Sequence, residues 1–363
     1  MSSTALFSPQ KALQIFGVER PWLELPQHAD FPPFARSGAN GRALKSWTLD
    51  QLPFIGESCG FLARPKRPVC AAIFVSKGGV LKTSLTLNIA RMAALHNIRT
   101  CIVGLDMQGD ATAALGFDAD DDEAGGASGE TFEQALTRLN DLRGLSDLYA
   151  GTCSLDEAIL PSDIPTLSYV PETPELVALD QSLVNRNRRE YWLLEQVVAP
   201  LKERFDLILL DCPPNWNRLI VNALIACDAL ISPLECKINN FRNFRVFQGL
   251  LNQFKAEMGV GFRHAYVPTR LSPGRKLSQE IYRWYRDNLE ACAETAIRDS
   301  VQGEEASALR LSLPEHAPHS TPGEEMRVLL REIWPTIAGA GPSPTKKKSR
   351  TPAPLNFQED ACP

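Results

Sequence analysis

The sequence predicts an α/β protein built on a doubly wound, mostly parallel sheet with helices on both faces. From residue 69 onward, short apolar runs of strand length alternate with longer stretches of helical spacing. This alternation is typical of a parallel sheet covered by helices on both sides. Polar motifs follow several of the runs, and ligands of such sheets bind beyond the carboxyl ends of the strands. We expect strands at residues 71–75, 101–105, 167–170, 207–210, 229–231 and 265–267.

Composition narrows the class of protein. The chain has 363 residues, a net charge of −5 and nine cysteines without metal-ligand spacing such as C-x-x-C. No apolar run reaches the roughly 18 residues that would span a bilayer, and the N-terminus lacks the order of a signal peptide. We therefore expect a cytoplasmic protein that does not bind membranes. The acidic balance requires that any nucleic-acid binding use a local basic patch.

The chain divides into three parts. Residues 1–68 are expected to form a small N-terminal helical extension, residues 69–340 the main domain, and residues 341–363 a disordered tail rich in Pro, Ser and Lys. Ser8 followed by Pro9 predicts a capped helix to residue 16. Residues 42–67 have two interpretations: a degenerate helix-turn-helix that binds an operator, or an arm that packs on the core or on a dimer. Pro53 argues against the first, because it falls inside the first expected helix.

The organising motif is the loop after the first strand of the main domain. Gly78-Gly79 supplies a tight turn, and helical spacing begins at Ser84. The free N–H groups and the dipole of a helix start favour an anion. Lys82 adds a positive charge for a terminal phosphate, and Thr83 offers a hydroxyl to a magnesium ion.

This loop departs from the ordinary phosphate-loop pattern G-x-x-x-x-G-K-[ST], because Ser76 and Leu81 occupy its two glycine positions. Two further motifs follow later strands. Asp106 follows the second strand, 24 positions after Lys82, within Asp-Met-Gln-Gly-Asp-Ala-Thr. A lone Asp there would be a helix cap. Asp211 ends the apolar run 207–210 and precedes Cys-Pro-Pro, an arrangement that delivers one carboxylate to a magnesium shell.

Together the three motifs resemble those of ParA/MinD-type P-loop ATPases with a deviant Walker A loop, closest to partition ParA (Soj-like) proteins. The resemblance covers about residues 69–335 and rests on K-G-G-x-x-K-T-S in the loop, the switch region that begins at Asp106, and D-C-P-P at Asp211. Three positions depart from the usual family pattern: Leu81 replaces a glycine, Met107 a proline and Asp110 an asparagine. The resemblance implies a P-loop fold, ATP and Mg²⁺.

The resemblance also implies roles for individual residues. Lys77 would reach across a homodimer to the nucleotide of the other subunit, and it would act with Lys82 and with Asp106, which orients the attacking water. Thr83 and Asp211 would hold Mg²⁺, the latter through water. Nucleotide contacts are expected from Lys77, Gly78, Gly79, Val80, Leu81, Lys82, Thr83, Ser84 and, at the adenine, Pro233.

For function, the resemblance implies a DNA partition ATPase with a weak intrinsic rate. Its ATP-bound dimer would bind nonspecific DNA on the nucleoid through Arg275, Lys276 and Arg298, and a ParB-type centromere-binding protein would stimulate hydrolysis and release it. Two alternatives remain at this point. One is a nucleotide-regulated DNA-binding autorepressor, and the other is a ParA-like ATPase that positions a cargo or the septum.

Overall fold

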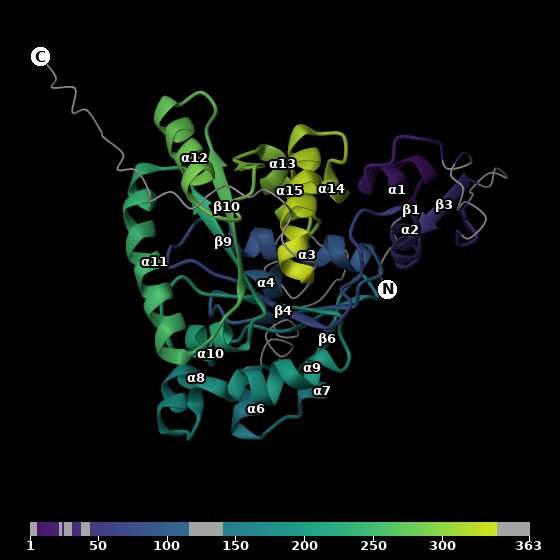
Figure 1. Cartoon of the computed structure of the whole chain (residues 1–363). Helices are drawn as coiled ribbons and strands as arrows, with labels where there is room; N and C mark the ends of the chain where they lie inside the picture. The colour runs from purple at the N-terminus through teal and green to yellow at the C-terminus, as the bar shows by residue number, and fades with distance from the viewer. Residues whose placement is uncertain (1–5, 22–23, 25–30, 38–43, 116–140, 340–363) are drawn as a thin grey trace, which may run out of the picture.

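The computed structural model describes residues 6–21, 24, 31–37, 44–115 and 141–339. At its centre lies an eight-stranded sheet (Figure 1), in the order β11-β10-β9-β4-β8-β5-β7-β6. Every neighbouring pair is parallel except β6 and β7. The strands are β4 (Val69–Ile73), β5 (Thr100–Gly104), β6 (Leu160–Pro161), β7 (Leu167–Val170), β8 (Leu207–Asp211), β9 (Ala229–Glu235), β10 (Arg263–Leu271) and β11 (Ile297–Arg298).

The predicted parallel sheet is confirmed, with small differences at its ends. All six expected strands are present, although β4 begins and ends two residues earlier than the predicted range 71–75. The strands β6 and β11 were not predicted. Each has two residues, which is too short to show a period of two, and each lies at an edge of the sheet.

Alternating strand residues supply two hydrophobic clusters, one on each face. In β4, Cys70 and Ala72 belong to the first cluster, whereas Ala71 and Ile73 belong to the second. The helices α3 (Lys82–Leu95), α13 (Val301–Ala308), α14 (Leu313–His316) and α15 (Thr321–Ala338) contribute to the second cluster. The first cluster is completed by α6 (Leu145–Ala150), α7 (Leu155–Ala158), α8 (Leu176–Ser182), α9 (Ala199–Lys202), α10 (Arg218–Ala226), α11 (Ile238–Met258) and α12 (Lys276–Asn288). In Figure 1, α3 and α15 lie above the strands, and α6, α8, α9 and α10 lie below them.

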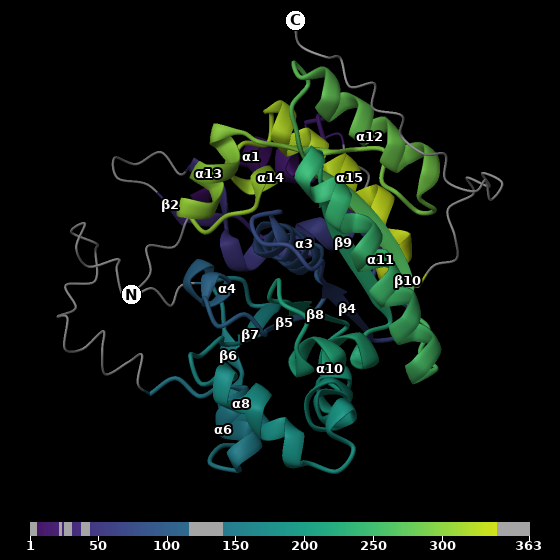
Figure 2. The same ribbon diagram turned by 90° about the vertical axis from the view of Figure 1, so that its left-hand side faces the viewer.

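The N-terminal extension is a layer packed on the second face. Its helix α1 (Pro9–Ile15) is capped as predicted, because the Ser8 hydroxyl accepts from the Lys11 N–H at 3.3 Å. It also contains an antiparallel sheet that was not predicted, formed by β1 (Leu6–Phe7), β2 (Ala35–Ser37) and β3 (Leu44–Thr48). Leu13 and Phe16 are buried in the same cluster as α3 and α15. Figure 2 shows α1 beside the C-terminal helices.

The degenerate helix-turn-helix, one of the two interpretations of residues 42–67, is not formed in residues 44–67, the part of that segment that the structure describes. A 3₁₀ turn at Leu49–Gln51 leads into the one α-helix of these residues, α2 (Leu52–Cys59), and Pro53 lies in the first turn of α2, where a proline is tolerated. Residues 60–68 contain no helix. They pack instead against the end of α3, where the Phe61 N–H donates to His96 Nε2 at 2.9 Å and a Cβ on Gly60 would meet the His96 ring.

Two other points concern the limits of the chain and of its helices. The tail predicted for residues 341–363 lies outside the described residues. Among the helices that are described, none has the length and apolar character needed to cross a bilayer.

Candidate functional site

The loop between β4 and α3 has the backbone that its two glycines predict. Gly79 has a φ of +71°, a conformation that favours glycine, and a Cβ on Gly78 or Gly79 would meet nothing within 4 Å. The loop therefore presents its backbone to open space. Leu81, immediately before α3, is also left-handed, with φ 70° and ψ 34°. A leucine in this region of the map stores backbone strain.

Lys82 is held against the loop that it follows. Its side chain is buried, and Nζ donates to the carbonyl oxygen of Lys77 at 3.0 Å. Burial lowers the pKa of Lys82, while the negative charges of Asp211 and Asp106 act in the opposite direction. The ammonium group thus lies among carboxylates at the start of α3. Lys77 is half-buried and lines a small cavity together with Pro233 of β9.

Asp211 ends β8 and is completely buried. Its Oδ2 accepts from the Thr83 hydroxyl at 2.7 Å, and its Oδ1 accepts from the Thr86 hydroxyl at 2.8 Å. Burial raises the pKa of Asp211 to about 6, although both hydroxyls and Lys82 favour the charged form. Sequence reasoning missed Thr86. Its position three residues after Thr83, on the same helix face, is the signal that would have found it.

Asp106 follows β5 and lies, like Asp211, at the edge of the sheet formed by the carboxyl ends of the strands. Its Oδ1 accepts from the Gln108 N–H at 3.2 Å, and its carbonyl accepts from the Gly109 N–H at 3.2 Å. It is half-buried, and its charge raises the pKa of both Lys82 and Asp211. The fold therefore gathers Lys82, Thr83, Asp106 and Asp211 at the carboxyl ends of β4, β5 and β8.

Two further charged residues touch this region and were not predicted as site residues. Arg270, at the end of β10, has a φ of 50°; its Nε donates to the Gly79 carbonyl at 2.8 Å, and its Nη1 pairs with Asp299 at 2.9 Å. Glu172, two residues after β7, is buried beside the helix that follows Asp106. Neither belongs to a motif that spacing alone reveals.

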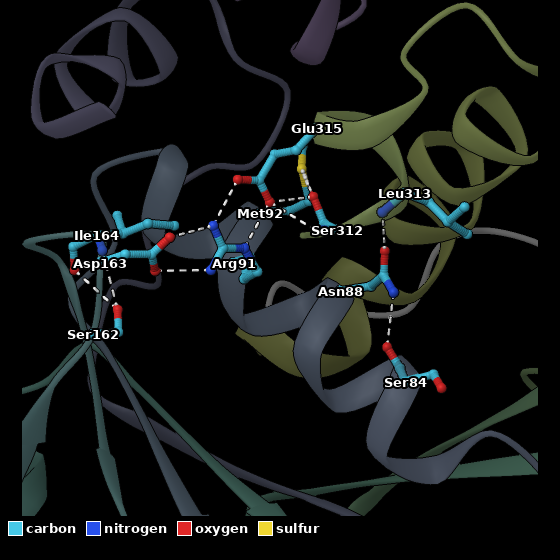
Figure 3. A network of polar contacts seen from close by, with 10 residues as sticks. All are labelled: Ser84, Asn88, Arg91, Met92, Ser162, Asp163, Ile164, Ser312, Leu313 and Glu315. Atoms are coloured by element: carbon cyan, nitrogen blue, oxygen red, sulfur yellow. Dashed lines mark hydrogen bonds and ion pairs between the residues drawn. The ribbon is translucent and has the colours of Figure 1, made fainter. Parts of the chain in front are cut away.

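A network of polar side-chain contacts fixes helix α3 to neighbouring elements (Figure 3). The guanidinium of Arg91 forms two hydrogen bonds with Glu315 of α14, both at 2.8 Å, and two with Asp163, at 2.8 and 2.9 Å. Asn88 donates to the Ser84 carbonyl at 2.8 Å and accepts from the Leu313 N–H at 2.9 Å. The phosphate-loop helix is thereby tied to α14 and to the turn between β6 and β7.

The three residues predicted to bind DNA are not equivalent. Arg275 precedes α12, and Lys276 begins it with a side chain that is 93% exposed. Both Lys276 and Arg298 lie in ion pairs: Lys276 Nζ is 3.8 Å from Glu280, and the guanidinium of Arg298 is 2.6 Å from Glu325 of α15. A paired arginine is a weaker phosphate ligand, because the contact must first be broken. Arg275 and Lys276 are both exposed, and the ion pair of Lys276 is longer than that of Arg298.

The donor set fits a nucleotide with a hard divalent cation. Threonine hydroxyl and carboxylate oxygens are the ligands that Mg²⁺ prefers, and Thr83 and Asp211 present them 2.7 Å apart. The buried ammonium of Lys82 and the open backbone at Gly78 and Gly79 fit a phosphate chain.

Comparison with known proteins places this site within a family. The AAA domain family matches residues 69–258, about half of the chain. The chromosome partitioning protein ParA of Myxococcus xanthus is 34% identical over 161 residues, which are 44% of this chain and 50% of that protein. The chain thus spans about half the length of this relative.

Other relatives match over longer stretches. The sporulation initiation inhibitor protein Soj of Bacillus subtilis is 26% identical over 269 residues, 72% of this chain and 96% of that protein. The cell division protein PomZ of M. xanthus is 24% identical over 266 residues, covering 73% and 77%. A putative plasmid partition protein of Borrelia burgdorferi, solved with AMPPNP, has the same fold with a TM-score of 0.58 at 16% identity, covering 74% and 98%.

Proposed function

The chain belongs to the ParA/MinD-type P-loop ATPases of the AAA domain family, and from that premise we propose that it is an ATP-dependent DNA partition ATPase. The observation that carries the proposal is the buried Asp211 carboxylate, which accepts from Thr83 directly beside a loop with two lysines. That arrangement joins a cation site to a phosphate site.

In this proposal each residue keeps the role that the family resemblance implies. Lys82 holds the terminal phosphates of ATP, while Thr83 and Asp211 hold magnesium, the latter through water. When bound, magnesium would neutralise charge on the phosphate oxygens. Asp106 orients the attacking water. Lys77, which is not held in an ion pair by the described residues, extends to the nucleotide of a second subunit in an ATP-bound homodimer.

The proposed partners are DNA and a ParB-type protein. The dimer binds nonspecific DNA on the nucleoid with Arg275 and Lys276, helped by Arg298 once its pair with Glu325 opens. A ParB-type centromere-binding protein stimulates a weak intrinsic ATPase and releases the dimer. The names of the ParA and Soj relatives support this direction.

One second function has a specific observation in its favour. The PomZ relative is a cell division protein and matches most of both chains, which supports a ParA-like ATPase that positions a septum or cargo. The autorepressor hypothesis has less support, because residues 44–68 form the strand β3, a 3₁₀ turn, the helix α2 and a segment without helix, so that the second helix of a helix-turn-helix is not formed there.

The test is the ATPase rate of the full chain alone, with DNA, and with DNA plus a candidate ParB-type protein. A partition ATPase should be fastest with both additions. Lys82→Ala should abolish nucleotide binding, Lys77→Ala should bind nucleotide but lose hydrolysis or dimerisation, and Asp106→Ala should trap an ATP dimer on DNA. Lys66→Ala, exposed at the opposite end of β4, is the matched control. Normal turnover by Lys77→Ala would contradict the dimer proposal.

A further inference from the structure

Glu172 brings a third carboxyl group to the edge of the sheet where Asp106 and Asp211 lie. It follows β7 by two residues and is 5% exposed. A Cβ on Gly104 would lie 2.0 Å from Glu172 Cγ, so the glutamate side chain lies directly over the end of β5. Gly104 is the register partner of Asp211. The side chain of Glu172 therefore crosses β5 toward the strand that carries Asp211.

One oxygen of Glu172 caps the helix that follows Asp106. This helix, α4 (Asp110–Ala114), begins after Gly109, which has a φ of +75° and no side chain with which to cap it. Glu172 Oε2 instead accepts from the N–H groups of Ala111 at 3.0 Å and Thr112 at 3.3 Å. In return the Glu172 N–H donates to the Thr112 hydroxyl at 2.7 Å. The start of α4 is thus tied to the end of β7 rather than to its own flanking residue.

The other oxygen of Glu172 argues for more than a structural cap. Glu172 Oε1 is buried and has no hydrogen-bond partner among the described residues. Burial, followed by the negative charge of Asp211, raises the pKa of Glu172 well above its usual range. A cap alone needs neither an unpaired oxygen nor a position beside Asp211, and such costs are kept mainly at functional sites.

The consequence concerns the switch segment, residues 106–114, which contains the Asp106 turn and α4. Its first residue, Asp106, lies two positions after the end of β5, and its helix is held by Glu172. The four residues from Asp106 to Gly109 are therefore fixed at both ends. We propose that Glu172 is a positioning residue for Asp106: by holding α4 from β7, it sets where the Asp106 turn lies over the phosphate loop. The inference rests on the proposed ATPase function.

The experiment compares Glu172 with a residue that makes the same bonds elsewhere. Glu332 of α15 also accepts from two consecutive backbone N–H groups, those of Glu294 at 2.7 Å and Thr295 at 3.0 Å, and from the Thr295 hydroxyl. Glu332→Ala thus removes the same kind of carboxylate-to-backbone contact in the connection before β11. The full chain is made as Glu172→Ala, Glu172→Asp, Glu172→Gln and Glu332→Ala. Asp is one methylene too short to reach α4, whereas Gln keeps both the length and one acceptor.

Two measurements are made on each protein: kcat and KM for ATP, and amide hydrogen exchange without nucleotide. Glu172→Ala and Glu172→Asp should lower kcat about tenfold with KM for ATP changed less than about twofold. Exchange at Ala111 and Thr112 should speed up at least about tenfold, with β7 unchanged. Glu172→Gln should keep most of the wild-type kcat and most of the protection from exchange at Ala111 and Thr112. Glu332→Ala should leave kcat unchanged.

Three outcomes would overturn the inference. The first is a kcat for Glu172→Asp that matches Glu332→Ala, and the second is unchanged exchange at Ala111 and Thr112. The third is a general rise in exchange that includes β7, which would mark a purely structural role. If Glu172→Ala does not fold, Glu172→Asp and Glu172→Gln still decide. A wild-type chain that does not hydrolyse ATP overturns the proposed function and this inference together, whereas normal wild-type turnover with unaffected variants overturns the inference alone.

Discussion

Leu81 is the residue at which the local sequence and the local backbone disagree. It occupies a left-handed conformation, φ 70° and ψ 34°, directly before the helix that carries Lys82. Leu81→Gly should raise the free energy of unfolding by about 1 kcal/mol, because glycine adopts this conformation without a steric penalty. Urea denaturation measures the change. Ala291→Gly is the matched control, since Ala291 is exposed and has a φ of 55°. The Ala291→Gly variant should be stabilised by a similar amount and should keep its affinity for ATP. A Leu81→Gly variant that is less stable than the wild type would contradict the argument.

At the same scale, motifs and lone residues differ in how far they can be predicted. Lys82, Thr83 and Asp211 lie in motifs whose order along the chain already implies a common edge of the sheet, and the structure places Thr83 2.7 Å from Asp211. Glu172 and Arg270 lie outside any motif. They reach the site only because β7 and β10 end beside it, and an isolated Glu or Arg in a sequence is ordinarily a surface charge.

The helix α3 owes its fixed position to a buried arginine on the side away from the nucleotide loop. Arg91 is 2% exposed and pairs with Glu315, which is also buried. Arg91→Met should cost about 3–5 kcal/mol of unfolding free energy, because Glu315 is left buried without its cation. Arg91→Met combined with Glu315→Gln should cost less than the sum of the single changes, as urea denaturation of the full cycle would measure.

The control for that cycle is an exposed ion pair. Arg204 pairs with Asp156, and both side chains are about half exposed or more. Arg204→Met should therefore cost less than about 1 kcal/mol. Strictly additive effects at Arg91 and Glu315 would show that the two side chains are not energetically coupled, and that α14 does not hold α3 through this contact.

Whole elements were predictable where their residues carry a clear period. The six long strands and the capped helix α1 follow from apolar runs and from the Ser-Pro start. The small antiparallel sheet of the extension was missed, because its strands have only two to five residues and show no clear period. The helix-turn-helix interpretation fails for a tertiary reason, because its second helix is not formed. Residues 60–62 are used to pack on the end of α3, and that contact is invisible in the sequence.

At the scale of the molecule, the extension and the main domain share one hydrophobic cluster, and His96 lies where they meet. Its ring is buried against Phe16 and Phe61, with Nδ1 2.6 Å from the Met92 carbonyl and Nε2 accepting from the Phe61 N–H. Both nitrogens are satisfied only in the neutral ring, since Nε2 must accept. Burial, aided by the charge of Arg331, lowers the pKa of His96 to about 4.

The sign of the resulting pH dependence follows from linkage. Below pH 6.5 the unfolded chain binds a proton that the folded His96 does not, so the stabilisation is complete above pH 6.5 and is lost as the pH falls toward 4. Protonation of His96 alone should lower the free energy of unfolding by about 3 kcal/mol across that window, and His264, with a pKa lowered to about 3, should add to this loss.

His96→Gln should flatten the pH dependence of stability, measured by urea denaturation from pH 7 to 4, when it is compared with the exposed control His319→Gln. Because the charged ring would oppose the Phe61 N–H, acid should release the extension first, and hydrogen exchange at residue 61 should rise before exchange in β4. Equal slopes for the two variants would show that the contact between extension and main domain does not depend on the state of His96.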